Sequence, residues 1–142
     1  MKHTLLLAVL IGLGTTPALA GDLKPGLWLI NTTMEGPNLP PQMRAQTQQE
    51  CLDADQANNI VDALRADWDA EGCELGEVER DGDNLSWEAT CKQASMNSRM
   101  KGSVELHSET HYTSHITMMM PGQEMQSISE GKWAAASCSP SP

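Results

Sequence analysis

The sequence is poor in the residues that usually fill a protein core. It has no Phe and a single Tyr, and Leu, Ile and Val together make up 16 of the 122 residues from 21 to 142. This share lies below the roughly 20 % at which a strongly charged chain is expected to be disordered. Eight Met residues after residue 20 and four Trp residues supply apolar volume that this count omits. We therefore expect a small folded core that depends on cross-links, as secreted domains of this size often do.

Basic residues are also scarce, and they form no cluster. Lys and Arg number 9 against 19 Asp and Glu, which gives a net charge of −10. A chain of this charge repels nucleic acid and anionic lipid. We therefore expect no nucleic-acid partner. Solubility accounts for the acidic excess, which by itself does not imply a cationic partner.

The sequence patterns of several enzyme classes are missing. There is no G-x-S-x-G nucleophile motif, no glycine-rich phosphate loop and no C-x-x-C pair. Spacing alone marks no two acidic residues as a catalytic pair. We therefore expect no enzymatic activity and no cofactor. A hydrolase that uses unrecognised acidic residues is the alternative.

The start of the chain has the three parts of an export signal. Met1-Lys2-His3 is a short basic start, residues 4–14 (TLLLAVLIGLG) are apolar, and Ala18-Leu19-Ala20 supplies the small residues of a cleavage site. The apolar run is shorter than the roughly 18 residues that a membrane-spanning helix needs. We predict that residues 1–20 are a signal peptide cleaved after Ala20. The mature protein is then periplasmic or secreted, without a membrane span.

The four cysteines predict two disulfides. An even number of cysteines in an exported chain is typical of a disulfide framework, and their spacings match no zinc pattern. Cys73 and Cys91 lie symmetrically about Gly82, which belongs to the strongest hairpin turn signal in the chain. A hairpin at that point places Cys73 opposite Cys91. Cys51 and Cys138 are then left to pair with each other.

One segment has the pattern of a short helix. Asp53 can cap it, and Gln56 stands where a capping box requires it. The apolar residues that follow fall on one stripe, and they are Ala57, Ile60, Val61, Leu64 and Trp68. Gly72 marks the end of this region. We expect the stripe to pack against a sheet.

The remaining chain predicts an antiparallel meander. Strands separated by turn signals are expected at about 27–34, 45–51, 73–80, 84–92, 98–107, 111–120 and 124–137. About seven strands and one short helix give a mainly β fold, either a bent sheet or an open barrel. Residues 21–138 then form a single β-rich domain, and residues 139–142 form a disordered tail.

Histidine and methionine residues raise the hypothesis of a metal site. His107, His111 and His115 are spaced by four, and a turn at residues 108–110 would place the first two on neighbouring strands. Methionines are dense at positions 96, 100, 118–120 and 125. Soft sulfur with imidazole in an exported protein is compatible with copper. We favour the alternative, in which methionines fill the core in place of Phe and the histidines are solvated. We therefore assign no metal ligand.

The order of several short motifs resembles the bacterial exported family catalogued as domain of unknown function 3617. The likeness rests on Lys24-Pro25-Gly26-Leu27-Trp28, Thr32-Thr33-Met34, Pro40-Pro41, Gln46-Thr47-Gln48, Cys51-Leu52, Gly72-Cys73, Asp81-Gly82, Leu85-Ser86-Trp87, Thr90-Cys91, Ile116-Thr117-Met118, Pro121-Gly122 and Gly131-Lys132-Trp133 with Cys138. It covers nearly all of residues 24–138. The resemblance implies a periplasmic, mostly β domain and transfers no catalytic residue. The three histidines are not a feature of the family, which makes a family-wide metal role less favoured.

Together these features favour a non-enzymatic binding or envelope-accessory module. Its partner would be a small apolar ligand or another envelope protein. Copper binding through the His and Met residues and an unrecognised hydrolase activity are the alternatives.

Overall fold

The computed structural model describes residues 22–93 and 96–139, and within them one antiparallel sheet dominates. The strands are β1 (Gly26–Glu35), β2 (Ala45–Leu52), β3 (Cys73–Leu75), β4 (Glu79–Asp81), β5 (Asn84–Gln93), β6 (Met96–Ser108), β7 (His111–Met120) and β8 (Gln123–Ala135). The helices are α1 (Ala54–Asn58), α2 (Ile60–Ala70) and the short 3-10 helix η1 (Pro41–Met43). The predicted signal peptide and residues 140–142 of the predicted tail lie outside the described residues.

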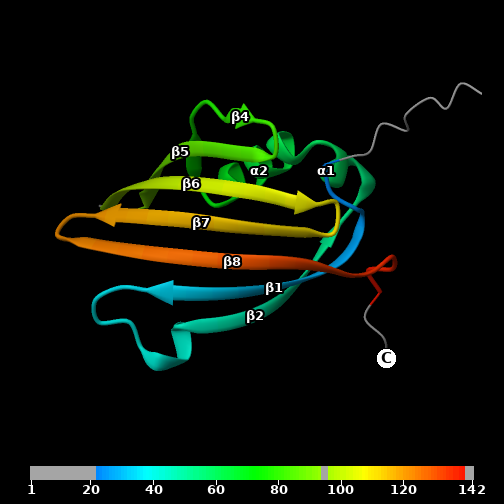
Figure 1. Ribbon diagram of the computed structural model, residues 1–142. Helices are drawn as coiled ribbons and strands as arrows, with labels where there is room; N and C mark the ends of the chain where they lie inside the picture. Colours follow the sequence, from blue (N-terminus) through cyan, green and yellow to red (C-terminus); the bar gives the residue numbers. More distant parts are fainter. Residues whose placement is uncertain (1–21, 94–95, 140–142) are drawn as a thin grey trace, which may run out of the picture.

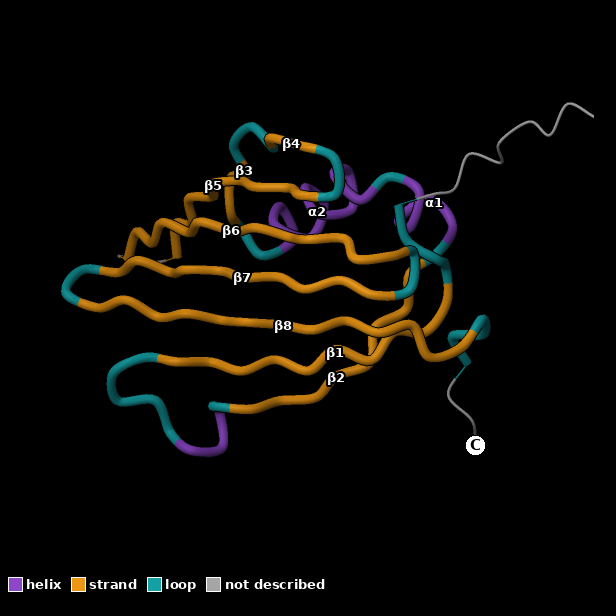
Figure 2. The backbone as a smooth tube through the Cα atoms, viewed as in Figure 1, coloured by secondary structure: helices purple, strands orange, loops and turns teal. Residues whose placement is uncertain are grey.

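The sheet is bent and does not close into a barrel. Its order is β2-β1-β8-β7-β6-β5-β3, with β4 paired to β5 beside β3. The two edges, β2 and β3, are joined in sequence by α1 and α2. In Figures 1 and 2 both helices lie on one side of the sheet, behind its β5–β6 region. We call the side that the helices cover the inner face and the opposite side the outer face.

The expected strand at 73–80 is in fact two strands, so the sheet has eight strands rather than about seven. Cys73 pairs with Cys91 as predicted, but Arg80 pairs with Leu85, a register displaced by one residue. The backbone N–H of Gly76 donates to the Glu88 carbonyl at 2.9 Å, which extends the register of β3 by one residue. The register therefore changes between Gly76 and Glu79, where β4 begins.

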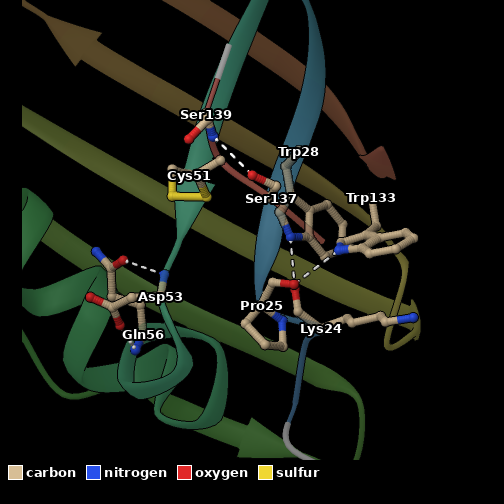
Figure 3. Close-up of a disulfide and its surroundings, with 10 residues drawn as sticks. Lys24, Pro25, Trp28, Cys51, Asp53, Gln56, Trp133, Ser137 and Ser139 are labelled. Carbon is tan, nitrogen blue, oxygen red and sulfur yellow. Dashed lines mark hydrogen bonds between the residues drawn. A yellow bond between two sulfur atoms is a disulfide. The ribbon is translucent and has the colours of Figure 1, made fainter. Parts of the chain in front are cut away.

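The predicted helix is also two helices. The capping box is present (Figure 3). The backbone N–H of Gln56 donates to Asp53 Oδ1 at 2.8 Å, and the backbone N–H of Asp53 donates to Gln56 Oε1 at 3.0 Å. Asn59 then leaves the helical conformation, with φ −129° and ψ 64°, and separates α1 from α2. Asparagine is common at such positions because its side chain can form hydrogen bonds with nearby backbone groups. Here the side-chain amide of Asn59 donates to the Asp55 carbonyl.

The predicted apolar stripe of the helices packs on the inner face, as expected. One buried cluster forms around Trp87 and the Cys73–Cys91 disulfide, and Leu64 and Trp68 pack against it. A second forms around Trp28, with Ile60 and Val61 packed against it. The stripe therefore joins the helices to both halves of the core.

Two strand glycines make room for aromatic side chains on the inner face. A Cβ atom at Gly131 would lie 2.3 Å from Tyr112 Cε1, and one at Gly102 would lie 2.3 Å from Trp87 Cε2. Each glycine is the direct cross-strand partner of that aromatic residue. The rings can therefore lie close to the sheet, which leaves space between them and the helices.

Two disulfides hold the sheet, in the predicted pairing. Cys73 bonds to Cys91 across the β3–β5 ladder, and Cys51 at the end of β2 bonds to Cys138. Beside the second disulfide, Trp28 Nε1 donates to the Lys24 carbonyl at 2.9 Å (Figure 3). Trp133 Nε1 likewise donates to the Pro25 carbonyl at 3.0 Å. Residues 24–25 are thus tied to β1 and β8, and the end of β2 is tied to Cys138.

Within the described residues, neither α1 nor α2 has the length and apolar character of a membrane-crossing helix.

Candidate functional site

A cavity of about 170 Å³ lies between the helices and the inner face of the sheet. The sheet wall combines aromatic and aliphatic side chains from four strands, namely Trp28, Leu85, Trp87, Val104, Tyr112 and Ile116. Trp28 is fully buried, and its ring centroid is 5.5 Å from that of Tyr112. Packed aromatic pairs of this kind form a rigid wall. Gly102 and Gly131 let the rings of Trp87 and Tyr112 lie close to the strands, and this leaves room for the cavity in front of the rings.

The helix wall comes from the stripe that the sequence predicts. Ile60, Ala63, Leu64 and Trp68 of α2 line the cavity. Ala63 is the smallest of them and stands between two larger neighbours on the same face. A larger residue at position 63 would fill the space, which makes this position useful for testing occupancy.

Five polar residues line this apolar space, including Gln56 and Ser114. Three of the polar groups have a perturbed pKa: the carboxyl groups of Glu50 and Asp67 and the hydroxyl group of Tyr112. Glu50 lies on β2 directly opposite Trp28, so its side chain shares the inner face. Desolvation, followed by the nearby charge of Asp67, raises the pKa of Glu50 above its usual range. Asp67, on the exposed margin of α2, also has a raised pKa, caused by desolvation and then by the charge of Glu71. The two carboxyl groups therefore destabilise each other's charged form.

Tyr112 is affected by the same charges. Burial, and then the charges of Glu50 and Asp67, raise the pKa of its hydroxyl group, so it stays protonated at neutral pH. No basic residue is present among the described residues that line the cavity. The side chain of Glu50 makes no ion pair or hydrogen bond with another described residue. An apolar space with a few convergent polar groups of perturbed pKa has the form of a small-molecule site.

The raised pKa of Glu50 predicts that its charge lowers the stability of the protein at neutral pH. The folded state holds the proton to higher pH than the unfolded state, so this group makes stability fall as pH rises from the ordinary glutamate pKa through the raised one. We expect Glu50→Gln to raise the unfolding free energy at pH 7 by a few tenths to about 1 kcal/mol, since the group is only partly buried. The difference should vanish below pH 4. Thermal unfolding between pH 3.5 and 8 measures this.

The control for this prediction is Glu74→Gln, at an exposed position of β3. It should leave the unfolding temperature at pH 7 unchanged. The charged group that raises the pKa of Glu50 is Asp67 of α2, which is itself affected by Glu71 at the end of that helix. The charge of Glu50 in turn raises the pKa of Tyr112 on β7. A Glu50→Gln variant less stable than the wild type at pH 7 would contradict this reading of the site.

A larger hollow lies on the outer face but has a different character. It measures about 470 Å³ and lies between the β4–β5 hairpin and the outer sides of β6 and β7. Its walls are mostly polar or charged, including Arg80, Ser103 and Glu105. The Arg80 guanidinium is already engaged by Asp22, at 2.7 and 3.0 Å. We therefore take the smaller apolar cavity on the inner face as the candidate site.

A comparison with family models finds a match to "Protein of unknown function (DUF3617)" over residues 23–138. The chain belongs to this family. The match confirms the resemblance drawn from the short motifs, and it includes all four cysteines and the whole described sheet. Comparisons with curated proteins and with solved structures find no match. Membership of the DUF3617 family supports a common fold and assigns no activity.

The histidines singled out from the sequence lie on the outer face of this DUF3617 domain. The His107 and His111 rings stack at 4.6 Å between centroids, on the neighbouring strands β6 and β7. His111 Nε2 donates to Glu130 at 2.9 Å, and His115 Nε2 donates to Gln126 at 3.2 Å. Hydrogen bonds from Lys132 and His111 hold the pKa of Glu130 below its usual range.

Of the three methionines on β7, only Met119 shares the outer face with His111 and His115. Met118 and Met120 alternate with His115 and Met119 along β7, so they lie on the inner face. Met100 is buried in the core. Among residues 22–93 and 96–139, no group of three or more His, Cys, Asp or Glu residues is placed to hold a metal ion. The proposed copper ligands are therefore divided between two faces of the sheet.

Sequence reasoning had not identified the polar residues of the cavity. The stripe containing Leu64 and Trp68, which forms the helix wall of the cavity, was predicted. Glu50 and Asp67 were overlooked because they are two among 19 acidic residues, and sequence spacing does not bring β2 near α2. One signal was available: Glu50 occupies the same face of its strand as Leu52.

Proposed function

We propose that this DUF3617 protein is an exported, non-enzymatic module that binds a small, mainly apolar molecule between α2 and the inner face of the sheet. The observation that carries the proposal is the cavity of about 170 Å³ with mainly apolar walls and three polar groups of perturbed pKa. A cavity of roughly 150 Å³ is enough to take up benzene. A ligand with a body of about six carbon atoms therefore fits the space.

The location of the protein is part of the proposal. Two disulfides and the absence of a membrane-crossing helix among the described residues are compatible with an oxidising compartment outside the cytoplasm. The leader predicted for residues 1–20 would deliver the chain there. We propose a periplasmic or secreted protein that acts as a carrier or accessory module of the cell envelope.

Thermal stabilisation by a neutral apolar probe tests the ligand proposal. We expect benzene to raise the unfolding temperature of the disulfide-bonded protein, because a ligand that binds only the folded state stabilises it by mass action. Ala63→Phe should fill the cavity and abolish the shift. Ala66→Phe, at an exposed position of the same helix, should leave the shift as in the wild type. An equal shift in both variants, or none in the wild type, would overturn the proposal.

A further inference from the structure

The inner face of the sheet carries a negative charge that the structure does not neutralise. Glu50 points from β2 into the core side of the sheet, opposite the fully buried Trp28. Its side chain makes no hydrogen bond and no ion pair with another described residue. An unpaired, half-buried carboxylate destabilises a fold unless something else compensates its charge. An apolar residue at position 50 would destabilise the folded state less.

The surroundings of Glu50 supply further negative charge and no positive charge. Asp67 lies close enough across the cavity for its charge to act on Glu50, and Glu71 acts in turn on Asp67. The described residues that line the cavity include no Lys, Arg or His. A cationic group placed here would therefore be attracted by two carboxylates and repelled by no residue of the lining. An anionic ligand would meet repulsion alone.

The third polar group of the cavity fits the same ligand. The Tyr112 hydroxyl makes no hydrogen bond with another described residue, and the charges of both Glu50 and Asp67 act on it. A hydroxyl oxygen accepts a hydrogen bond, as do the two carboxylates. A primary ammonium group has three N–H donors, which matches one acceptor from each of the three side chains. The aromatic walls beside them also favour a cation.

We propose that the ligand of this cavity is a primary alkyl- or arylalkyl-amine, with its ammonium group held by Glu50, Asp67 and Tyr112 and its apolar body held against Trp28, Trp87 and Trp68. The proposal rests on the proposed function, since it names the chemical class of the molecule bound in the same cavity. About six carbon atoms of the ligand fit inside the cavity, and a longer alkyl chain would extend out of the cavity. A divalent cation is a poorer occupant, because the walls are apolar and no group of three metal ligands forms among the described residues.

A matched set of three ligands tests the proposal on the full disulfide-bonded protein. The probes are n-hexylamine, n-hexanol and n-hexanoate, which share one alkyl chain and carry a positive, zero and negative charge at pH 7. Isothermal titration calorimetry measures the dissociation constant of each. We expect hexylamine to bind at least about tenfold more tightly than hexanol, as charge-assisted hydrogen bonds do relative to neutral ones. Hexanoate should not bind measurably.

Variants of the protein test the contribution of the ammonium group to the affinity separately from that of the alkyl chain. Glu50→Gln combined with Asp67→Asn should bring the affinity for hexylamine to within about twofold of that for hexanol, and should leave hexanol binding unchanged. Both substitutions remove mutual repulsion, so the variant should fold. Asp69→Asn, at an exposed position of α2 outside the cavity lining, should retain the full preference for the amine.

The outcomes distinguish this inference from the proposed function. Equal binding of hexylamine and hexanol, abolished by Ala63→Phe, would overturn the amine assignment and leave the apolar site in place. Absence of binding by all three probes would overturn both. A preference for hexylamine that survives in the Glu50→Gln, Asp67→Asn variant would assign the cation to another surface of this acidic protein, and would also overturn the inference.

Discussion

Replacing Cys51 and Cys138 by serine should lower the free energy of unfolding by about 4.5 kcal/mol at 25 °C. The two cysteines are 87 residues apart, and in the chain-entropy model a cross-link of that length restricts the unfolded state by about this amount. Domains of this size are stable by only about 5 to 15 kcal/mol. The core here is also poor in aliphatic residues. Urea unfolding followed by circular dichroism should therefore show a protein that is barely stable or unfolded.

The second disulfide provides the comparison for this experiment. Cys73 and Cys91 are 18 residues apart, so their replacement by serine should cost less, about 3 kcal/mol in the same model. Both double variants remove two sulfur atoms, and they differ mainly in the length of chain that the bond closes. A larger loss from the Cys73–Cys91 pair than from the Cys51–Cys138 pair would contradict this explanation of the stability.

Trp28→Ala should lower the free energy of unfolding by about 3 to 5 kcal/mol, the range found for truncation of a buried Trp or Phe. Trp28 is fully buried, it packs on Tyr112, and its Nε1 donates to the Lys24 carbonyl. The substitution therefore removes apolar contacts, an aromatic pair and a hydrogen bond together. Urea unfolding with the disulfides intact measures the loss.

Leu29→Ala is the matched control, one residue further along the same strand. Leu29 points to the outer face and is 37 % exposed, whereas the exposure of Trp28 is 0 %. The control should cost less, no more than about 2 kcal/mol, because more than a third of the Leu29 surface is already in water. Similar losses for both variants would show that β1 does not separate an inner face from an outer face as described.

Local sequence signals predicted much of this fold correctly. The turn at Gly82 and the symmetric positions of Cys73 and Cys91 were sufficient to predict a cross-strand pair, since hairpin register depends on residues near in sequence. The capping box at Asp53 and Gln56 placed the helix start for the same reason.

Features that depend on contacts between distant segments were not predicted. The register changes by one residue between β3 and β4, and no pattern within 73–80 reveals this. The choice between an open sheet and a barrel depends on how β2 and β3 are placed at opposite edges. The site itself arises where β2, α2 and β7 meet.

The candidate site accounts for two features that packing alone leaves unexplained. Gly102 and Gly131 weaken their strands but allow Trp87 and Tyr112 to lie flat enough to leave a cavity. Glu50 places a charge where an apolar residue would be more stable. Residues that reduce stability in this way tend to occur at functional sites.

The indole N–H resonances in a two-dimensional ¹H–¹⁵N NMR spectrum give the most direct test of ligand binding in the cavity. Trp28, Trp68 and Trp87 line the cavity, whereas Trp133 lies outside it, with Lys24 above its ring. During titration with n-hexylamine, we predict saturable shifts of the first three indole resonances and an unchanged Trp133 resonance. Unchanged resonances of all four, or a shift confined to Trp133, would contradict the existence of this binding site.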